Sequence, residues 1–118
     1  MTMPNLDQIS FRLVSDNEEG DIDQRTIFEY QQQDSCIWGR YYGPTVRAGV
    51  LFGTMDESGD LDFVYSHVDH LNQLKRGHCF STLEKLPSGL LRYHEKWSWT
   101  GDQKGSGSNI IEQIPHHD

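Results

Sequence analysis

Positive charge and long apolar segments are both scarce in this chain. It has 10 Lys and Arg residues against 18 Asp and Glu residues, and its formal net charge is −8. Contacts with phosphate groups need clustered basic side chains, so this balance argues against binding to nucleic acid or to an anionic membrane surface. No apolar run approaches the roughly 20 residues that cross a bilayer as a helix. The sequence therefore predicts neither a nucleic-acid partner nor a membrane partner.

Cysteine is equally rare, and an export signal is lacking. The two cysteines, Cys36 and Cys79, are far apart in the sequence. Residues 1–5 do not contain a basic segment followed by an apolar one, and no Asn-x-Ser/Thr glycosylation site is present. Without an export signal, reduced thiols are the expected state. We therefore expect a cytoplasmic protein with two free thiols.

The motifs of metal binding and of nucleophilic catalysis are also missing. The chain contains no Cys-x-x-Cys, no His-Glu-x-x-His and no Gly-x-Ser-x-Gly sequence. His78 directly precedes Cys79 in a predicted strand, so their side chains point to opposite faces and cannot form a dyad there. The sequence predicts no metal site and no cofactor, and it does not identify a catalytic residue.

Aromatic residues and closely spaced turn signals are what the chain does have. Only 35% of the residues are hydrophobic, but 13 are aromatic (5 Phe, 5 Tyr and 3 Trp), and each of these buries a large apolar area. Clusters of Gly, Pro, Asn, Asp and Ser recur at short intervals between segments rich in β-branched and aromatic residues. They predict eight strands, at about residues 9–15, 25–33, 35–43, 46–56, 60–68, 73–83, 89–100 and 106–114.

The pattern within these strands predicts how they are arranged. Residues 61–67 and 91–99 alternate between two kinds of side chain with the period of two that is typical of a strand with one buried face. Short connections make consecutive strands antiparallel neighbours. Eight such strands predict an all-β, up-and-down antiparallel β-barrel of the calycin type, in a single domain over residues 1–118 with an ordered core at about 8–114. A two-sheet β-sandwich is the alternative.

Glu95 is the most informative polar residue. It lies on an otherwise apolar strand face between Tyr93 and Trp97. A carboxylate that faces an aromatic interior is costly unless it is paired or protonated, and such groups can anchor a ligand or take part in acid–base chemistry. The alternative is a structural tie, in which Glu95 bonds to Arg40, Arg76 or a Tyr hydroxyl.

His67 is the second polar candidate, because it shares a predicted strand face with Tyr65. An imidazole can titrate near neutral pH, although a lone His on an apolar face is also a common core residue with satisfied hydrogen bonds. The residues that we predict to line a ligand-binding interior are Tyr41, Tyr65, His67, Glu95, Trp97 and Trp99.

Three segments in the second half carry a family resemblance. They are LDFVYSHV at 61–68, GHCFST at 77–82 and LPSGLLRYHEKWSWT at 86–100. These segments, with a looser match over residues 10–114, are similar to small bacterial proteins that are often labelled "N-acetylglutamate synthase" in genomes. The resemblance implies a lipocalin-like or avidin-like barrel.

The residues themselves do not support N-acetyltransferase activity. An acetyl-CoA-dependent enzyme of the usual kind holds the pyrophosphate at a helix N-terminus, behind a loop of the form Gln/Arg-x-x-Gly-x-Gly/Ala. The nearest segment, QKGSG at 103–107, has one residue too few between Gln and the first Gly. It also leads into a predicted strand, so nothing in this region provides the helix.

Three functions are compatible with these observations. The first is binding of a small, partly apolar ligand inside the barrel, with aromatic walls and Glu95 or His67 as polar anchors. The second is a structural or interaction module, or a homo-oligomer, with a filled barrel. The third is an isomerase or lyase in which Glu95 and His67 act as base and acid. We rank ligand binding first and catalysis last.

Overall fold

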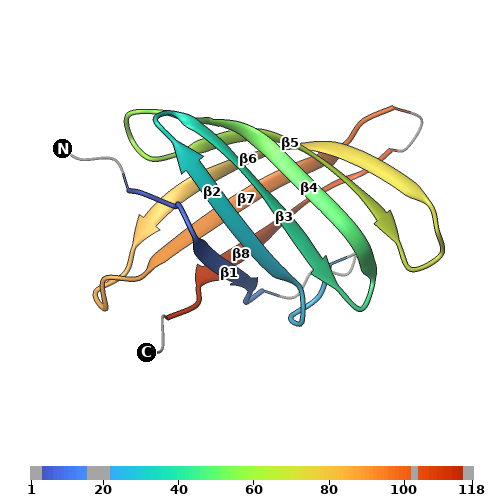
Figure 1. The fold of residues 1–118 in the computed structure, drawn as a ribbon, viewed down its shortest axis with the longest axis horizontal. Helices are drawn as coiled ribbons and strands as arrows, with labels where there is room; N and C mark the ends of the chain where they lie inside the picture. The colour runs from blue at the N-terminus through green and yellow to red at the C-terminus, as the bar shows by residue number, and fades with distance from the viewer. Residues whose placement is uncertain (1–3, 16–21, 102–103, 116–118) are drawn as a thin grey trace.

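The structure is a computed structural model that describes residues 4–15, 22–101 and 104–115. Its strands are β1 (Ile9–Leu13), β2 (Ile27–Gln33), β3 (Cys36–Gly43), β4 (Val46–Met55), β5 (Leu61–Asp69), β6 (Leu74–Lys85), β7 (Leu91–Trp99) and β8 (Ser106–Gln113). Each strand pairs with the next in antiparallel orientation, and β1 pairs with β8 (Figure 1). The eight-stranded barrel predicted from the sequence is confirmed, and the β-sandwich alternative is wrong.

The predicted strands agree with the observed ones to within a few residues. No strand end differs by more than two residues; β1, for example, is predicted over residues 9–15 and ends at Leu13. Beyond this strand, Val14 still donates its backbone N–H to the carbonyl of Ile110. The part of the chain that the structure describes has no helix long and apolar enough to cross a membrane.

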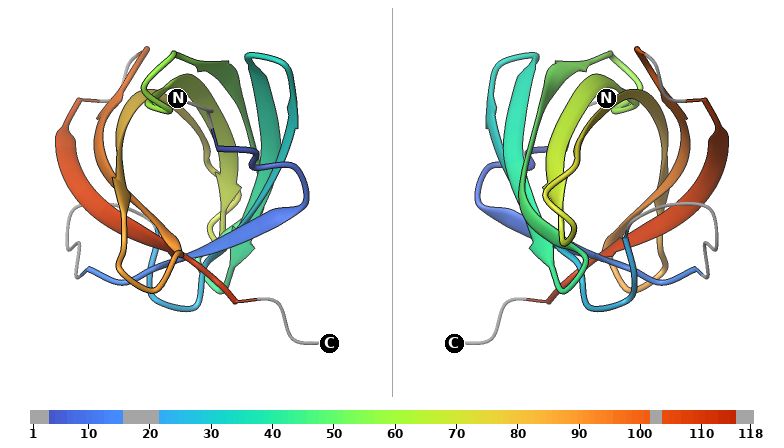
Figure 2. Two further views of the ribbon diagram at one scale, coloured as in Figure 1. Left: turned by 90° about the vertical axis from the view of Figure 1, so that its left-hand side faces the viewer. Right: turned by 90° about the vertical axis from the view of Figure 1, so that its right-hand side faces the viewer.

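The two ends of the barrel are built differently (Figures 1 and 2). The β2–β3, β4–β5 and β6–β7 connections lie at one end together with the N-terminal segment. There Leu6 is fully buried in the core, and its backbone N–H donates to Gln32 Oε1 at 2.8 Å. We call this the closed end. The β1–β2, β3–β4, β5–β6 and β7–β8 connections lie at the other end, which we call the open end.

Aromatic side chains fill the interior near the closed end. The ring of Phe11 lies 5.3 Å from that of Tyr30 and 5.7 Å from that of Tyr93, measured between centroids. The buried Tyr93 hydroxyl donates to the carbonyl of Gly59 in the β4–β5 turn at 2.8 Å. The half of the interior near the closed end is therefore packed with these side chains.

The outer surface of the barrel is uneven. Among the described residues, the exposed large hydrophobic side chains lie on β3, β4, β5 and β6 and in the β5–β6 turn, and none lies on β7, β8, β1 or β2. They are Trp38, Tyr42, Val50, Phe52, Val64, Leu71, Leu74 and Phe80. The barrel therefore has one outer face that is much more apolar than the opposite one.

Candidate functional site

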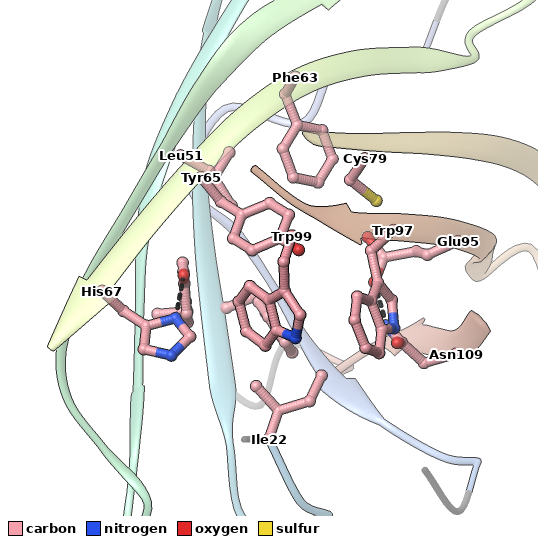
Figure 3. Close-up of a pocket in the computed structure, with 12 residues that line it drawn as sticks. Ile22, Leu51, Phe63, Tyr65, His67, Cys79, Glu95, Trp97, Trp99 and Asn109 are labelled. Carbon is pink, nitrogen blue, oxygen red and sulfur yellow. Dashed lines mark hydrogen bonds between the residues drawn. The ribbon is translucent and has the colours of Figure 1, made fainter. Parts of the chain in front are cut away.

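A cavity of about 60 Å³ lies inside the barrel in the half nearer the open end (Figure 3). All six residues predicted from the sequence line it, namely Tyr41, Tyr65, His67, Glu95, Trp97 and Trp99. The other residues that line it are Ile22, Phe28, Leu51, Phe63, Cys79 and Asn109. The alternation of inward and outward side chains along β3, β5 and β7 brings the six predicted residues to one place.

Three of the aromatic side chains in the cavity wall lie over glycines of the neighbouring strand. These cross-strand pairs are Tyr41 with Gly49, Tyr65 with Gly77 and Trp97 with Gly107. A Cβ atom on the glycine would come within 2.7, 2.2 and 2.6 Å of the aromatic side chain, respectively. Each ring can therefore lie flat against the wall only because its partner has no side chain.

Glu95 sits in the middle of a row of polar side chains that crosses three strands. Ser81 on β6 and Asn109 on β8 are its direct cross-strand neighbours. Ser81 Oγ donates to Glu95 Oε2 at 3.1 Å, and Asn109 Nδ2 donates to Glu95 Oε1 at 2.5 Å. The Glu95 residue is only 5% exposed. A buried carboxyl group is thus held by two neutral donors at the bottom of the cavity.

Burial sets the protonation of Glu95. Removal from water disfavours the charged form and raises the pKa of Glu95 to about 7, although hydrogen bonds from Ser81, Cys79 and Asn109 oppose the shift. The sequence-based alternative of a tie to Arg40 or Arg76 is wrong, because both arginines lie on the outer face. Arg40 Nε there donates to Glu29 Oε1 at 2.5 Å. Within the described residues, Glu95 has no cationic partner that would hold it ionised.

Ser81 and Asn109 are the functional candidates that sequence reasoning missed. Both are small polar residues in strands with weak alternation, and neither stands out in its own segment. The available signal was the hairpin register, which places each of them opposite Glu95 once the β6–β7 and β7–β8 turns are fixed. Cys79 was considered for catalysis, but it is buried and its pKa is raised far above the usual range, mainly by desolvation. Its thiol is therefore a poor nucleophile.

His67 lies higher in the cavity, nearer the open end. Its Nδ1 is 2.7 Å from the hydroxyl of Tyr41, and its ring meets the Tyr41 and Trp99 rings edge-on at 5.5 and 5.8 Å. Beside it, Lys75 Nζ lies 3.2 Å from Asp69 Oδ2 and 5.6 Å from the centroid of the Trp99 ring. Polar groups therefore occur at two levels along the barrel. The carboxyl group of Glu95 lies at the bottom of the cavity, and the imidazole of His67 and the nearby ammonium group of Lys75 lie nearer the open end.

The arrangement suits recognition of a small polar group between aromatic walls. The two polar levels are separated by Tyr65, Trp97 and Trp99, and the Trp97 and Trp99 rings lie 5.3 Å apart. Over the described ranges, no three His, Cys, Asp or Glu side chains come together to hold a metal ion. Figure 3 shows the carboxyl end of Glu95 beside Asn109 and Trp97, and His67 on the far side of Trp99.

Comparison with known proteins agrees with this architecture. No curated protein and no solved structure matches the chain. A family model described as "Avidin-like protein" matches residues 4–114, which include all eight strands. The chain therefore belongs to the avidin-like protein family.

Proposed function

We propose that the protein binds a small, partly apolar molecule in the barrel interior, with a hydrogen-bond-donating end of that molecule against Glu95. The observation that carries this proposal is a buried carboxyl group at the bottom of an aromatic-lined cavity, without a cationic partner among the described residues. Such a group is costly to bury, and a ligand donor would lower that cost. A barrel interior that is completely filled would offer no such place.

The size of the cavity limits what enters it. One water molecule needs roughly 10–15 Å³ by this measure of volume, so a cavity of about 60 Å³ has room for about four to six waters or one small ring. Pockets that enclose drug-sized ligands measure roughly 300–1,000 Å³. The interior therefore accommodates the end of a molecule, while the remainder passes the half-buried Trp99 and Ile22 toward the open end.

The hydrogen-bonding capacity of Glu95 indicates the chemistry of that end. Each oxygen of the ionised carboxylate has two lone pairs, and Glu95 accepts hydrogen bonds from Ser81, Cys79 and Asn109. One of the four acceptor sites is left for a ligand. Above pH 7, where Glu95 is ionised, an N–H group of a urea, an amide or an amine meets this requirement, whereas an ester or a ketone does not.

The cysteines support the proposed compartment. Cys36 is exposed on the outer surface and Cys79 is buried in the interior, and both are free thiols. Side chains on opposite sides of the barrel wall cannot form a disulfide with each other. A chain with free thiols fits a reducing compartment, and we propose the cytoplasm.

Tryptophan fluorescence tests the proposal, because Trp97 and Trp99 line the cavity. Phenylurea, which donates N–H groups, should quench or shift the emission at concentrations at least tenfold lower than acetophenone, which only accepts. At pH 8, where Glu95 is ionised, Glu95→Gln should weaken phenylurea binding at least tenfold, since a hydrogen bond to a charged group contributes about 1.5–3 kcal/mol. Glu112→Gln, on the outer face of β8, is the matched control and should leave binding unchanged.

Equal affinity for the two probes, or an unchanged affinity in Glu95→Gln, would show that Glu95 does not recognise a donor. Native mass spectrometry of the protein purified from cells then addresses the natural ligand. We expect a co-purifying mass on the wild-type chain that is absent from Glu95→Gln.

A further inference from the structure

Glu95 lies in a cavity wall that does not compensate its charge. It is the acidic residue of that wall, and the hydroxyl, thiol and amide groups that donate hydrogen bonds to it are all neutral. Lys75, nearer the open end, is already paired with Asp69, whose Oδ2 lies 3.2 Å from Lys75 Nζ. Buried charges are normally paired. Within the described residues, ionised Glu95 has no such pair, so a compensating positive charge has to come from a bound molecule.

The aromatic part of the cavity wall is suited to a positive charge. Phe63, Tyr65, Trp99 and Trp97 form a continuous row of rings, and successive ring centroids along it are 6.5, 5.9 and 5.3 Å apart. The faces of aromatic rings attract cations, and tryptophan does so most strongly. Lys75 Nζ already lies 5.6 Å from the centroid of the Trp99 ring. The row therefore holds one ammonium group in the free protein and offers further ring faces inside the cavity.

We propose that the inner end of the ligand is an organic ammonium ion, which donates an N–H group to Glu95 and places its positive charge among the rings of Tyr65, Trp97 and Trp99. This inference rests on the ligand-binding function proposed above, and it narrows the ligand from any N–H donor to a cation. A urea or an amide could donate the same hydrogen bond. It would leave the buried carboxylate without a compensating charge, which is unfavourable in an interior of low dielectric constant.

The dimensions of the cavity fit such a group. Its volume of about 60 Å³ has room for about four to six water molecules, which matches an ammonium nitrogen and the first few carbon atoms attached to it. The ion therefore enters without its shell of water. The N–H groups that do not bond to Glu95 can face the rings, which accept weak hydrogen bonds. Ring faces and the carboxylate together replace the hydration that the ion loses.

Binding of a cation should release a proton from the protein below neutral pH. Burial raises the pKa of Glu95 in the free protein to about 7, so at lower pH the carboxyl group must lose a proton before it can pair with the cation. The other titratable groups around it are the Cys79 thiol on β6, the Tyr30 hydroxyl on β2 and the Tyr93 hydroxyl on β7. Desolvation raises the pKa of each of these groups well above the neutral range, so they stay uncharged.

Two basic groups lie nearer the open end and bear on the same pH range. Lys75 keeps its pair with Asp69, and His67 Nδ1 lies 2.7 Å from the Tyr41 hydroxyl. Protonation of His67 would add a positive charge to the cavity and would weaken cation binding in acid, in the same direction as protonation of Glu95. Glu95→Gln retains this imidazole, so a comparison of this variant with wild type separates the two contributions.

Calorimetric titration with benzylamine and benzyl alcohol at pH 8 tests the proposal. The two probes have nearly the same shape, and both donate a hydrogen bond, but only the amine carries a charge. We expect wild type to bind benzylamine at least tenfold more tightly than benzyl alcohol. Glu95→Gln should bind benzylamine no more tightly than benzyl alcohol, whereas the outer-face control Glu112→Gln should keep the wild-type preference. Circular dichroism checks that both variants are folded.

The same titration at lower pH measures the coupled proton. An alkylammonium ion keeps its charge from pH 5 to pH 8, as the Lys side chain with its pKa of about 10.4 does. Wild type should therefore bind benzylamine at least tenfold more weakly at pH 5 than at pH 8, and Glu95→Gln should lose most of this difference. At pH 6, titration in two buffers of different ionisation enthalpy should show the release of close to one proton for each benzylamine bound to wild type.

The outcomes separate this inference from the function on which it rests. Equal affinity of wild type for benzylamine and benzyl alcohol, together with phenylurea binding that depends on Glu95, would overturn the cation and leave the proposed function standing. A preference for benzylamine that Glu95→Gln retains would also overturn it, because another group would then hold the charge. If none of the three probes binds, both proposals fail.

Discussion

Burial of the ionised Glu95 carboxylate lowers the stability of the folded protein, and the hydrogen bonds around this group offset only part of that loss. Two neutral hydrogen-bond donors replace only part of the water that the carboxylate loses, so its protonated form is favoured in the folded state. Structural ties of buried carboxylates normally use arginine or lysine, and none is present beside Glu95 in the described part of the chain. This distinguishes Glu95 from Glu29, whose partner Arg40 is a cationic group on the surface.

The stability of the protein should fall as the pH rises through the titration range of Glu95. The pKa of Glu95 is about 7 in the folded state and 4.5 as a model value, so between these limits the folded chain retains a proton that the unfolded chain has lost. The stabilisation is complete below pH 4.5 and is lost as the pH passes 7. We expect the unfolding free energy to decrease by about 2–3 kcal/mol between pH 5 and pH 8 from this group.

Urea denaturation at the two pH values measures this effect, and Glu95→Gln provides the comparison. The amide cannot ionise, so the variant should lack this part of the pH dependence and should be more stable than wild type at pH 8. Identical pH dependence in the two proteins would contradict the assignment.

Tyr30 and Tyr93 are two buried tyrosines whose hydroxyl groups differ in hydrogen bonding. Both are fully buried, but within the described residues the Tyr30 hydroxyl has no hydrogen-bond partner, whereas that of Tyr93 donates to Gly59. Tyr30→Phe removes an unsatisfied polar group and should raise the unfolding free energy by about 1 kcal/mol. Tyr93→Phe leaves a carbonyl without its donor and should lower it by about the same amount. Thermal and chemical denaturation of both variants check the opposite signs.

The sequence was sufficient to predict six of the twelve residues that line the cavity, but not the hydrogen-bond partners of Glu95. Tyr65, His67, Glu95, Trp97 and Trp99 are read from the alternation of two strands, which is a property of each segment alone. The hydrogen bonds of Glu95 depend on how three strands are aligned with one another. That alignment is fixed by turn geometry, so the sequence pattern suggested distant arginines where the structure has Ser81 and Asn109.

At the scale of single strands, glycines shape the cavity. Gly49, Gly77 and Gly107 interrupt the apolar pattern of their strands and lower the local strand propensity, so they appear unfavourable when each segment is considered alone. The structural reason for these glycines lies in the neighbouring strand, because an aromatic ring of that strand covers each glycine and leaves no room for a Cβ atom. The eight strands could be predicted, whereas these pairings could not.

Gly107→Ala should displace the Trp97 ring. The new Cβ atom would lie 2.6 Å from Trp97 Cζ2, closer than carbon atoms can approach, so the indole must move into the cavity. We expect a loss of about 1–3 kcal/mol in unfolding free energy, typical of overpacking, and a changed near-ultraviolet circular dichroism spectrum. Ser108→Ala, on the outer face of the same strand, should change neither quantity. An unaltered spectrum for Gly107→Ala would mean that the ring is not constrained in this way.

The seam between β1 and β8 should be the weakest part of the barrel wall. These strands pair in register over residues 11–13 of β1, with one further backbone hydrogen bond at each end, whereas β6 and β7 pair over Gly77–Lys85. Short pairing makes local opening easier than global unfolding. Hydrogen exchange followed by mass spectrometry should show faster exchange in β1 than in β4–β7. Equal protection all around the barrel would indicate that the buried Phe11 and Leu13 side chains alone hold the seam.

At the scale of the whole molecule, the outer surface is divided into an apolar half and a polar half. The sequence did not reveal this division, because apolar residues on both faces of β4 obscure the alternation there. Which outward residues adjoin one another becomes apparent only after the barrel is closed. The net charge of −8 belongs to the whole chain and conceals Arg40, Arg47 and Arg76, which gather beside the apolar half.

The difference between the closed and open ends has a further consequence for how a ligand is held. The cavity lies in the half nearer the open end and is walled by the strands of a single chain. A molecule that displays the ligand on a tether should therefore be bound with the tether leaving through the open end, and titration of the single cavity described here should give a Hill coefficient of 1.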